Sequence, residues 1–199
     1  CALPIFIIGL GCEDKYHNVP GAEAYTHSIQ TLSKSRETYH RISELPKGAR
    51  VGIVGAGLSG IELASELRES RSDLEILLYD RGPRILRNFP EKLSKYISNW
   101  FSKHNVTVVP NSVIDRVEPG KIYNNGKPEN IDLVVWTAGI QPVEIVRNLP
   151  IDMSTSGRVI INQYHQVPTY RNVYVVGDCA NLPHAPSAQL AELQGEQIA

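Results

Sequence analysis

The stretch VGIVGAGLSGIELA, residues 51–64, decides the fold. An apolar run over residues 51–54 leads into three glycines in the pattern GxGxxG and then into a helical pattern. In a βαβ unit, Gly55 permits the tight turn, Gly57 lets the backbone approach a pyrophosphate, and Gly60 lets the helix pack closely on the strand. The sequence therefore predicts a dinucleotide-binding site. The alternative is a glycine-rich turn that holds no ligand.

The start of the following helix supplies the phosphate-binding half of this site. Free N–H groups at Leu58, Ser59 and Gly60, together with the positive end of the helix dipole, favour a bound phosphate. Asp80 ends the next strand, twenty residues after Gly60, where a carboxylate accepts hydrogen bonds from the adenosine ribose. This arrangement predicts that the helix start binds the pyrophosphate of a dinucleotide and that Asp80 binds its adenosine ribose.

The charge of Asp80 predicts NAD(H) rather than NADP(H). A 2′-phosphate about 4 Å from the carboxylate is repelled by about 1 kcal/mol in water and about 4 kcal/mol at an effective dielectric constant of 20. Arg81 keeps the opposite preference open, because its guanidinium could receive that phosphate. Arg84 and Arg87 could do so too, but we interpret both as a solvated rim.

Strands and helices alternate through the middle of the chain, which is typical of a parallel sheet covered by helices. Two short runs separated by turn residues predict an antiparallel meander or hairpin. The fold class is thus α/β, a Rossmann-like βαβ parallel sheet with an antiparallel β-meander. We expect strands at 5–10, 51–54, 74–79, 106–109, 113–118, 121–124, 133–136, 159–161 and 173–176, and helices at 28–45, 58–70, 90–103 and from about Pro186.

Composition excludes several classes of partner. The chain has 199 residues, a formal charge of -1 and no block of like charge, so nucleic acid is not expected. No apolar run is long enough to cross a bilayer, which predicts a soluble, cytoplasmic chain. Three cysteines form no CxxC pair, and His165 and His184 lack a second ligand at metal spacing. Reduced thiols and no metal site are therefore expected.

Two further carboxylates leave alternatives open. Glu62 follows Gly60 in what we take as the first turn of the helix, where it either stabilises the helix dipole or has a functional role. Asp178 ends the apolar strand in NVYVVGDCA, residues 172–180, where it either caps the next turn or meets a hydroxylated ligand. The residues alone do not decide between these roles.

Five segments in this order and spacing resemble the pyridine nucleotide-disulfide oxidoreductase superfamily, and within it the type II NADH dehydrogenases, particularly the NADH dehydrogenase-like proteins of Bacillus-type bacteria. The resemblance covers almost the whole chain. It implies a nucleotide-binding domain at 46–142 between two partial FAD-domain segments, 1–45 and 143–199. The segments are GAGLSGIELASEL, EILLYDRGPRIL, DLVVWTAGIQP, NVYVVGDCA and APSAQLAELQG.

The resemblance also implies roles for individual residues. Ala138 and Gly139 would lie where the two nucleotide domains meet. Asp178 would hold the ribityl chain of FAD, with Gly177 beside it in the same site. Ala188 and Gln189 would approach the isoalloxazine ring beside the quinone side, and Glu62 would lie near nicotinamide and flavin and assist proton transfer. The NAD(H) residues are those of the glycine turn, Gly55, Gly57, Leu58, Ser59 and Gly60, with Asp80 and Arg81.

The chain departs from the family pattern at several points. The N-terminal FAD fingerprint and the C-terminal membrane-anchoring region are absent, which implies a fragment that is inactive alone. Leu193 and Gln194 stand where the quinone-side motif carries two glutamines. The redox-active cysteine pair of the disulfide reductases is missing too.

The expected function is that of the NAD(H)-binding portion of a flavin-dependent NADH dehydrogenase, which passes a hydride from NADH to FAD and electrons to a quinone-type acceptor. In the intact protein, a peripheral location on the inner face of the cell membrane would depend on the missing C-terminal region. The alternatives are a flavoprotein reductase with a non-quinone acceptor and an NADH-sensing module.

Overall fold

The computed structural model describes residues 4–183 and 187–198. The chain divides into two compact units, Asp14–Gly139 and Cys1–Glu13 with Ile140–Ala199. Residues 14–45 pack within the first of these units, whereas the sequence placed the start of the nucleotide-binding domain at residue 46. The assignment of the flanking segments to a flavin domain stays a prediction.

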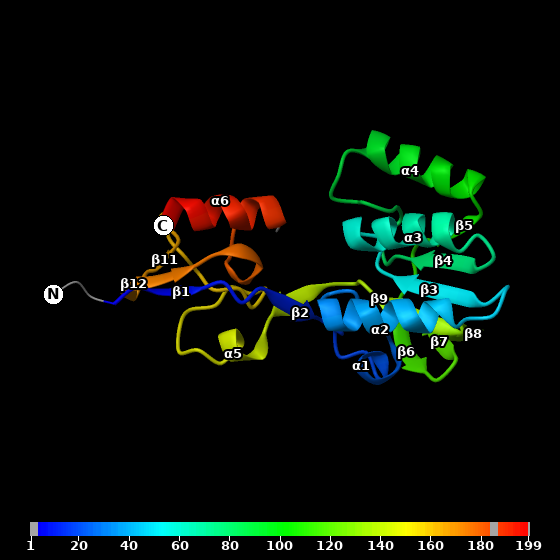
Figure 1. The fold of residues 1–199 in the computed structure, drawn as a ribbon, viewed down its shortest axis with the longest axis horizontal. Helices are drawn as coiled ribbons and strands as arrows, with labels where there is room; N and C mark the ends of the chain where they lie inside the picture. Colours follow the sequence, from blue (N-terminus) through cyan, green and yellow to red (C-terminus); the bar gives the residue numbers. More distant parts are fainter. Residues whose placement is uncertain (1–3, 184–186, 199) are drawn as a thin grey trace. The chain divides into compact units, whose positions relative to one another are not determined.

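A four-stranded parallel sheet forms the centre of the unit 14–139, in the order β5-β4-β3-β9 (Figure 1). Val51 of β3 lies opposite Ile76 of β4 on one side and Leu133 of β9 on the other. The α/β fold class is confirmed, and each strand falls within one residue of its expected bounds. The strands are β3 (Arg50–Val54), β4 (Glu75–Tyr79), β5 (Val106–Val109) and β9 (Leu133–Trp136).

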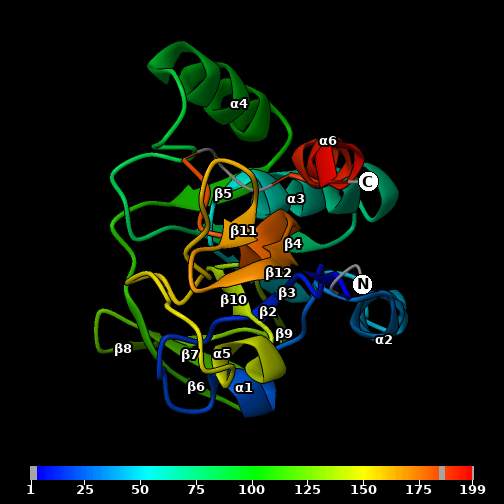
Figure 2. The ribbon, with the colours of Figure 1, turned by 90° about the vertical axis from the view of Figure 1, so that its left-hand side faces the viewer.

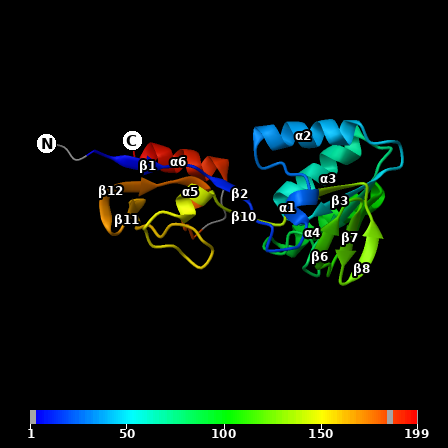
Figure 3. The same ribbon diagram turned by 90° about the horizontal axis from the view of Figure 1, so that it is seen from below.

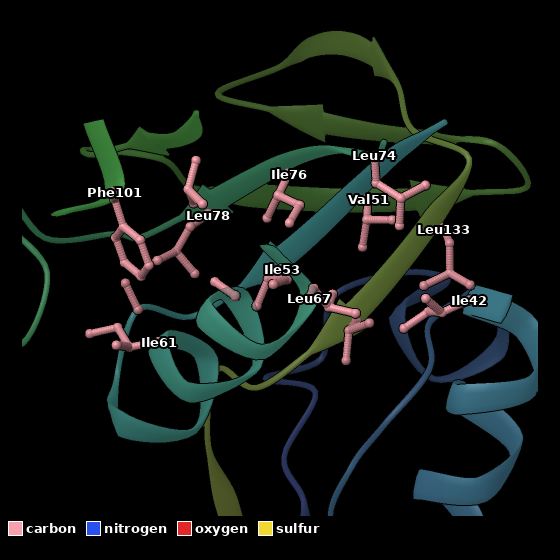
Figure 4. Close-up of a cluster of buried hydrophobic side chains, with 14 of the residues drawn as sticks. Ile42, Val51, Ile53, Ile61, Leu67, Leu74, Ile76, Leu78, Phe101 and Leu133 are labelled. Atoms are coloured by element: carbon pink, nitrogen blue, oxygen red, sulfur yellow. The ribbon is translucent and has the colours of Figure 1, made fainter. Parts of the chain in front are cut away.

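Three helices cover one face of this sheet. They are α2 (Leu32–Ser43), α3 (Leu58–Ser70) and α4 (Glu91–Lys103). Because side chains alternate along a strand, every second apolar residue of β3 and β4 enters this layer. Figure 4 shows Ile53, Ile76 and Leu78 of the sheet close to Ile61 of α3 and Phe101 of α4. This cluster is the largest apolar core of the unit.

The other face of the sheet is covered by α1 (Ala22–Tyr25) and by the expected antiparallel meander (Figure 3). Tyr79 of β4 and Trp136 of β9 pack here. The buried Tyr79 hydroxyl donates to Glu129 Oε2 over 2.7 Å, which joins the sheet to the meander. The meander consists of β6 (Ile114–Glu118), β7 (Lys121–Asn124) and β8 (Lys127–Asn130).

The second unit contains a sheet in the order β1-β12-β11, with β1 and β12 parallel. Figures 1 and 2 show α6 on one side of this sheet and α5 on the other. Val146, Val159 and Val175 are fully buried in its core. Its elements are β1 (Phe6–Ile8), β2 (Cys12–Asp14), β10 (Ile140–Pro142), α5 (Glu144–Arg147), β11 (Gln166–Val167), β12 (Tyr170–Val175), the 3₁₀ turn η1 (Gly177–Cys179) and α6 (Ala188–Ile198).

The expected strand at residues 159–161 is wrong. Val159 forms isolated bridges to Met153 and Ala180, but no strand continues from it. Ile160 is 38% exposed and has no strand beside it, so the apolar run lacks the neighbour that a ladder requires.

Candidate functional site

The turn between β3 and α3 is built from its glycines. Gly55 has φ +110, and a Cβ there would lie 2.8 Å from the backbone of Thr137 and Ala138. A Cβ on Gly60 would collide with the Gly55 carbonyl, so the helix packs directly on the strand end. Only glycine satisfies both constraints. The strand, the turn and the helix occupy the positions that the GxGxxG pattern predicts.

Gly57 differs from its two neighbours because nothing lies within 4 Å of the position of its Cβ. It is the exposed N-cap of α3, and no side chain caps the helix. The first intrahelical bond runs from Ile61 N to Gly57 O, so the N–H groups of Leu58, Ser59 and Gly60 have no partner within the helix. An open backbone and free N–H groups together form a surface that an anion can approach.

Asp80 stands beside this turn at the end of β4. Its Oδ2 accepts a hydrogen bond from Ala56 N over 2.8 Å, and its Oδ1 accepts one from Gly82 N over 2.6 Å. Each carboxylate oxygen can accept a second bond, so the partly buried side chain keeps capacity for a ribose hydroxyl. The two backbone bonds hold the carboxylate at the glycine turn.

A cleft of about 510 Å³ opens at this end of the sheet. It brings together the glycine turn, Asp80 and the residues after β9, all within the unit 14–139. Such a crevice at the carboxyl ends of parallel strands is where α/β folds bind ligands. The expected site residues that line it are Gly55, Gly57, Asp80, Arg81, Ala138 and Gly139.

The basic residues after Asp80 play different parts. Arg81 is exposed and lines the cleft, so it can reach a ligand there. Arg87 is exposed and lines the cleft too. Arg84 is not a solvated rim residue: its guanidinium donates to the carbonyls of the loop that follows. These acceptors are Leu86 O at 3.1 Å, Arg87 O at 2.8 Å and Phe89 O at 3.1 Å.

Glu62 does not lie at the helix start. Helix α3 begins at Leu58, so Glu62 is its fifth residue, and the first turn contains no acidic residue. The expected first-turn position is therefore wrong, and the dipole stabilises Glu62 little because its effect decays within one turn. The side chain is exposed and is not among the residues that line the cleft. Its part in proton transfer stays a prediction.

A loop before α1 contributes a residue that the sequence did not single out. His17 lines the cleft, and its Nε2 lies 3.0 Å from Ala138 O. Lys15 N donates to Gly139 O over 3.0 Å, which fixes the loop against the end of β9. Neither contact leaves a local sequence pattern, because the partners lie more than 100 residues apart.

In the second unit, Gly177 and Asp178 form the turn after β12. Gly177 has φ +70, and its N–H donates to Gln194 Oε1 over 2.8 Å. The carboxylate of Asp178 has no hydrogen-bond partner among the described residues, while its backbone carbonyl accepts from Arg158 Nε over 2.8 Å. A partly buried carboxylate without a partner can meet a hydroxylated ligand.

Helix α6 begins at Ala188, and Ala188 and Gln189 are exposed in its first turn. Gln194 is 2% exposed, and its side-chain oxygen binds the Gly177 N–H. Leu193, by contrast, is 56% exposed. Gln194 therefore ties α6 to the turn after β12, a structural role that no local sequence pattern indicates.

The cysteines of the described chain are poor nucleophiles. Burial raises the pKa of Cys12 to about 11, although Arg158 opposes the shift. Burial also raises the pKa of Cys179, which is fully buried. Cys1 and His184 lie outside the described residues. Both described thiols are protonated at neutral pH.

In residues 4–183 and 187–198 no group of three or more His, Cys, Asp and Glu side chains is placed to bind a metal ion. None of the helices in the same ranges combines the length and the apolar composition that a bilayer crossing requires.

The chain is similar to known proteins in both sequence and fold. Residues 5–195 match the family described as pyridine nucleotide-disulphide oxidoreductase. NADH dehydrogenase-like protein YutJ of Bacillus subtilis (strain 168) is 58% identical over 192 residues, covering 96% of this chain and 54% of that protein. An external alternative NADH-ubiquinone oxidoreductase, mitochondrial, of Yarrowia lipolytica is 21% identical over 231 residues, covering 97% of this chain and 40% of that protein.

Among solved structures, the water-forming NADH oxidase from Lactobacillus brevis bound to NADH superposes with a TM-score of 0.85 at 17% identity. The match covers 98% of this chain and 45% of that one. At such identity the likeness shows the fold alone. The chain spans about half the length of the relatives that it matches.

Proposed function

We propose that this chain, which belongs to the pyridine nucleotide-disulphide oxidoreductase family, binds NAD(H) in the cleft at the carboxyl ends of β4, β3 and β9. One observation carries the proposal. The open backbone of Gly57, the uncapped start of α3 and the carboxylate of Asp80 stand side by side along one cleft. That combination meets a pyrophosphate and an adenosine ribose at once.

The strand order supports one orientation of the dinucleotide in the cleft. Asp80, at the end of β4, takes the adenosine ribose, and the turn after β3 takes the pyrophosphate. Because β3 lies between β4 and β9, the nicotinamide half extends toward the residues after β9. Ala138 and Gly139 are the proposed contacts there. Leu58, Ser59 and Gly60 offer their N–H groups to the phosphates.

The preferred cofactor is NAD(H) rather than NADP(H). The carboxylate of Asp80 is fixed by Ala56 N and Gly82 N, so it cannot turn away from a 2′-phosphate without breaking both bonds. Arg81 is exposed and free to move toward solvent. The fixed negative charge therefore outweighs the mobile positive one.

In the intact protein, we propose that FAD completes the enzyme, a flavin-dependent NADH oxidoreductase. FAD, when bound, accepts the hydride of NADH and passes electrons to the final acceptor. The carboxylate of Asp178, which has no hydrogen-bond partner among the described residues, fits a ribityl hydroxyl, and Gly177 lies beside it in the same turn. Ala188, Gln189 and Glu62 take the roles implied by the family resemblance. The chain's own part is binding and orientation.

The proposed acceptor is a quinone, which is supported by the relative named as an NADH-ubiquinone oxidoreductase. A second candidate function is a reductase that passes electrons to an acceptor other than a quinone. One observation on helix α6 favours it. Gln194 is buried and bonded to Gly177 N, while its neighbour Leu193 is exposed. No glutamine of this motif is free to meet a quinone. A peripheral membrane location of the intact protein is proposed only together with the quinone acceptor.

Fluorescence tests NADH binding directly. Trp136 lines the cleft, so its emission should transfer to the reduced nicotinamide when NADH binds. We expect saturable quenching of tryptophan emission that ADP reverses. Quenching that rises without saturation, and that ADP leaves unchanged, would contradict it. Replacement of the second tryptophan, Trp100→Phe on α4, leaves the Trp136 signal as the readout.

A further inference from the structure

The loop before α1 places a histidine ring at the edge of the nucleotide cleft. His17 lines the cleft, and its Nε2 lies 3.0 Å from Ala138 O. Two more bonds fix the same loop: Lys15 N donates to Gly139 O, and Trp136 Nε1 donates to Lys15 O, each over 3.0 Å. The ring is therefore held in place before any ligand arrives.

The backbone on both sides of the contact between His17 and Ala138 has features that few other residues could provide. His17 adopts φ +52 and Asn18 adopts φ +57, a left-handed conformation that residues other than glycine rarely take. Opposite them, a Cβ on Gly139 would lie only 2.9 Å from His17 Nε2. Gly139 leaves the room that the imidazole occupies. Such strained positions persist only where the surroundings determine them.

The hydrogen bond to Ala138 sets the chemistry of the ring. A carbonyl oxygen only accepts, so Nε2 carries the hydrogen, and Nδ1 of the neutral imidazole is then an acceptor. Nδ1 has no hydrogen-bond partner among the described residues. An acceptor at this point matches a hydroxyl or an amide N–H and not a phosphate oxygen.

The position of His17 selects the half of the ligand that it meets. Asp80 lies at the end of β4, and His17 is bound to the residues after β9, on the other side of β3. A dinucleotide whose adenosine ribose is at Asp80 therefore brings its nicotinamide half to His17. We propose that His17 is a positioning residue that accepts a hydrogen bond from the nicotinamide ribose or the carboxamide. This inference rests on the proposed function.

Three ligands and one matched pair of variants test it. His17→Ala removes the ring, and Asn18→Ala introduces the same left-handed strain at an exposed neighbour that does not line the cleft. Calorimetric titrations use NADH, ADP-ribose and ADP. We expect NADH to bind about fivefold more weakly to His17→Ala than to Asn18→Ala, the factor that one net hydrogen bond of about 1 kcal/mol represents.

The partial ligands locate the contact. ADP affinity should be the same in both variants, because ADP lacks the nicotinamide half. ADP-ribose should weaken as NADH does if the partner is the ribose, and stay unchanged if the partner is the carboxamide. A second variant, His17→Asn, keeps a residue that tolerates the left-handed conformation and should behave as His17→Ala toward NADH.

Two results would overturn the inference: equal NADH affinity in His17→Ala and Asn18→Ala, or a parallel fall in ADP affinity. Failure of the proposed function is distinct from both. In that case the unchanged chain would bind none of the three ligands.

Discussion

The Asp80 carboxylate and the Ala56 N–H, hydrogen-bonded over 2.8 Å, join the end of β4 to the glycine turn after β3. The same carboxylate accepts from Gly82 N over 2.6 Å. The carboxylate that we expect to bind the ribose is thus hydrogen-bonded to the glycine turn that we expect to bind the pyrophosphate. Its loss should change both the stability of the turn and the selectivity of the cleft.

Replacement of the carboxylate by an amide separates these effects. In Asp80→Asn one oxygen becomes an NH₂ group, so the amide of Ala56 or Gly82 loses its acceptor, at a cost of about 1–3 kcal/mol in the free energy of unfolding. NADH should bind about tenfold more weakly, and the ratio of NADPH to NADH affinity should rise because the charge is gone. Calorimetric titration and urea unfolding measure the two effects.

Asp73→Asn is the matched control, since it removes an equal charge from a carboxylate that pairs with Arg71 outside the cleft. An unchanged NADPH to NADH ratio in Asp80→Asn would show that Asp80 does not set the cofactor preference.

Alanine substitutions of Gly57 and Gly60, the two glycines at the start of α3, should differ in their effects: the first mainly weakens NADH binding, and the second mainly destabilises the fold. In Gly57→Ala the methyl group enters open space at a negative φ, so the free energy of unfolding should fall only by about 0.5–1 kcal/mol, the cost of alanine at an N-cap, while NADH affinity is lost. In Gly60→Ala the methyl group meets the Gly55 carbonyl, and the chain should be destabilised by about 1–3 kcal/mol or more. Thermal unfolding and NADH titration of both variants check this pair. A Gly57→Ala chain that binds NADH normally would show that no pyrophosphate approaches this point.

The stability of the unit 14–139 should depend on pH through His27. Burial lowers the pKa of His27 below its ordinary value of 6.5. The unfolded chain then binds the proton more readily, so the stabilisation is complete above about pH 6.5 and is lost as the pH falls through the lower folded pKa. Between about pH 7.5 and pH 5.5 the melting temperature should fall more for the unchanged chain than for His27→Gln. Equal falls would refute this assignment.

The buried thiols should react slowly in the native state. Cys12 is 9% exposed and Cys179 is 0% exposed, and burial raises the pKa of both. A disulfide reagent at neutral pH should therefore modify them only after unfolding, because the thiolate is the reactive form. Counting the modified thiols by mass spectrometry, with and without urea, gives the result. Rapid native labelling of Cys12 would instead indicate an accessible redox thiol.

Long patterned elements were predictable from the sequence. The helix Leu58–Ser70 and the strand Leu133–Trp136 have the bounds that their patterns indicate. Between the glycine turn and β9, strong periodicity coincides with clear turn signals. Short elements such as α1 and β10 were missed, because three or four residues carry too little pattern and tertiary partners determine their conformation.

The candidate site was predictable where a local rule exists. The glycine turn and Asp80 lie together along the cleft as their spacing indicates. His17 was not identified and Arg84 was wrongly interpreted as a rim residue, because their roles depend on contacts with distant carbonyls or on the path of a loop. Glu62 was wrongly placed in the first turn, although the predicted helix start at Leu58 is correct, because a fifth helical residue lies beyond that turn.

Calorimetric titration of the chain with NADH and, separately, with NADPH decides whether the cleft of the unit 14–139 binds a dinucleotide and which one it prefers. We expect saturable binding of NADH with one site per chain and much weaker binding of NADPH, since the fixed carboxylate of Asp80 repels a 2′-phosphate. Equal or tighter binding of NADPH would assign the preference to Arg81. Binding of neither nucleotide would contradict the proposal that this cleft holds a dinucleotide.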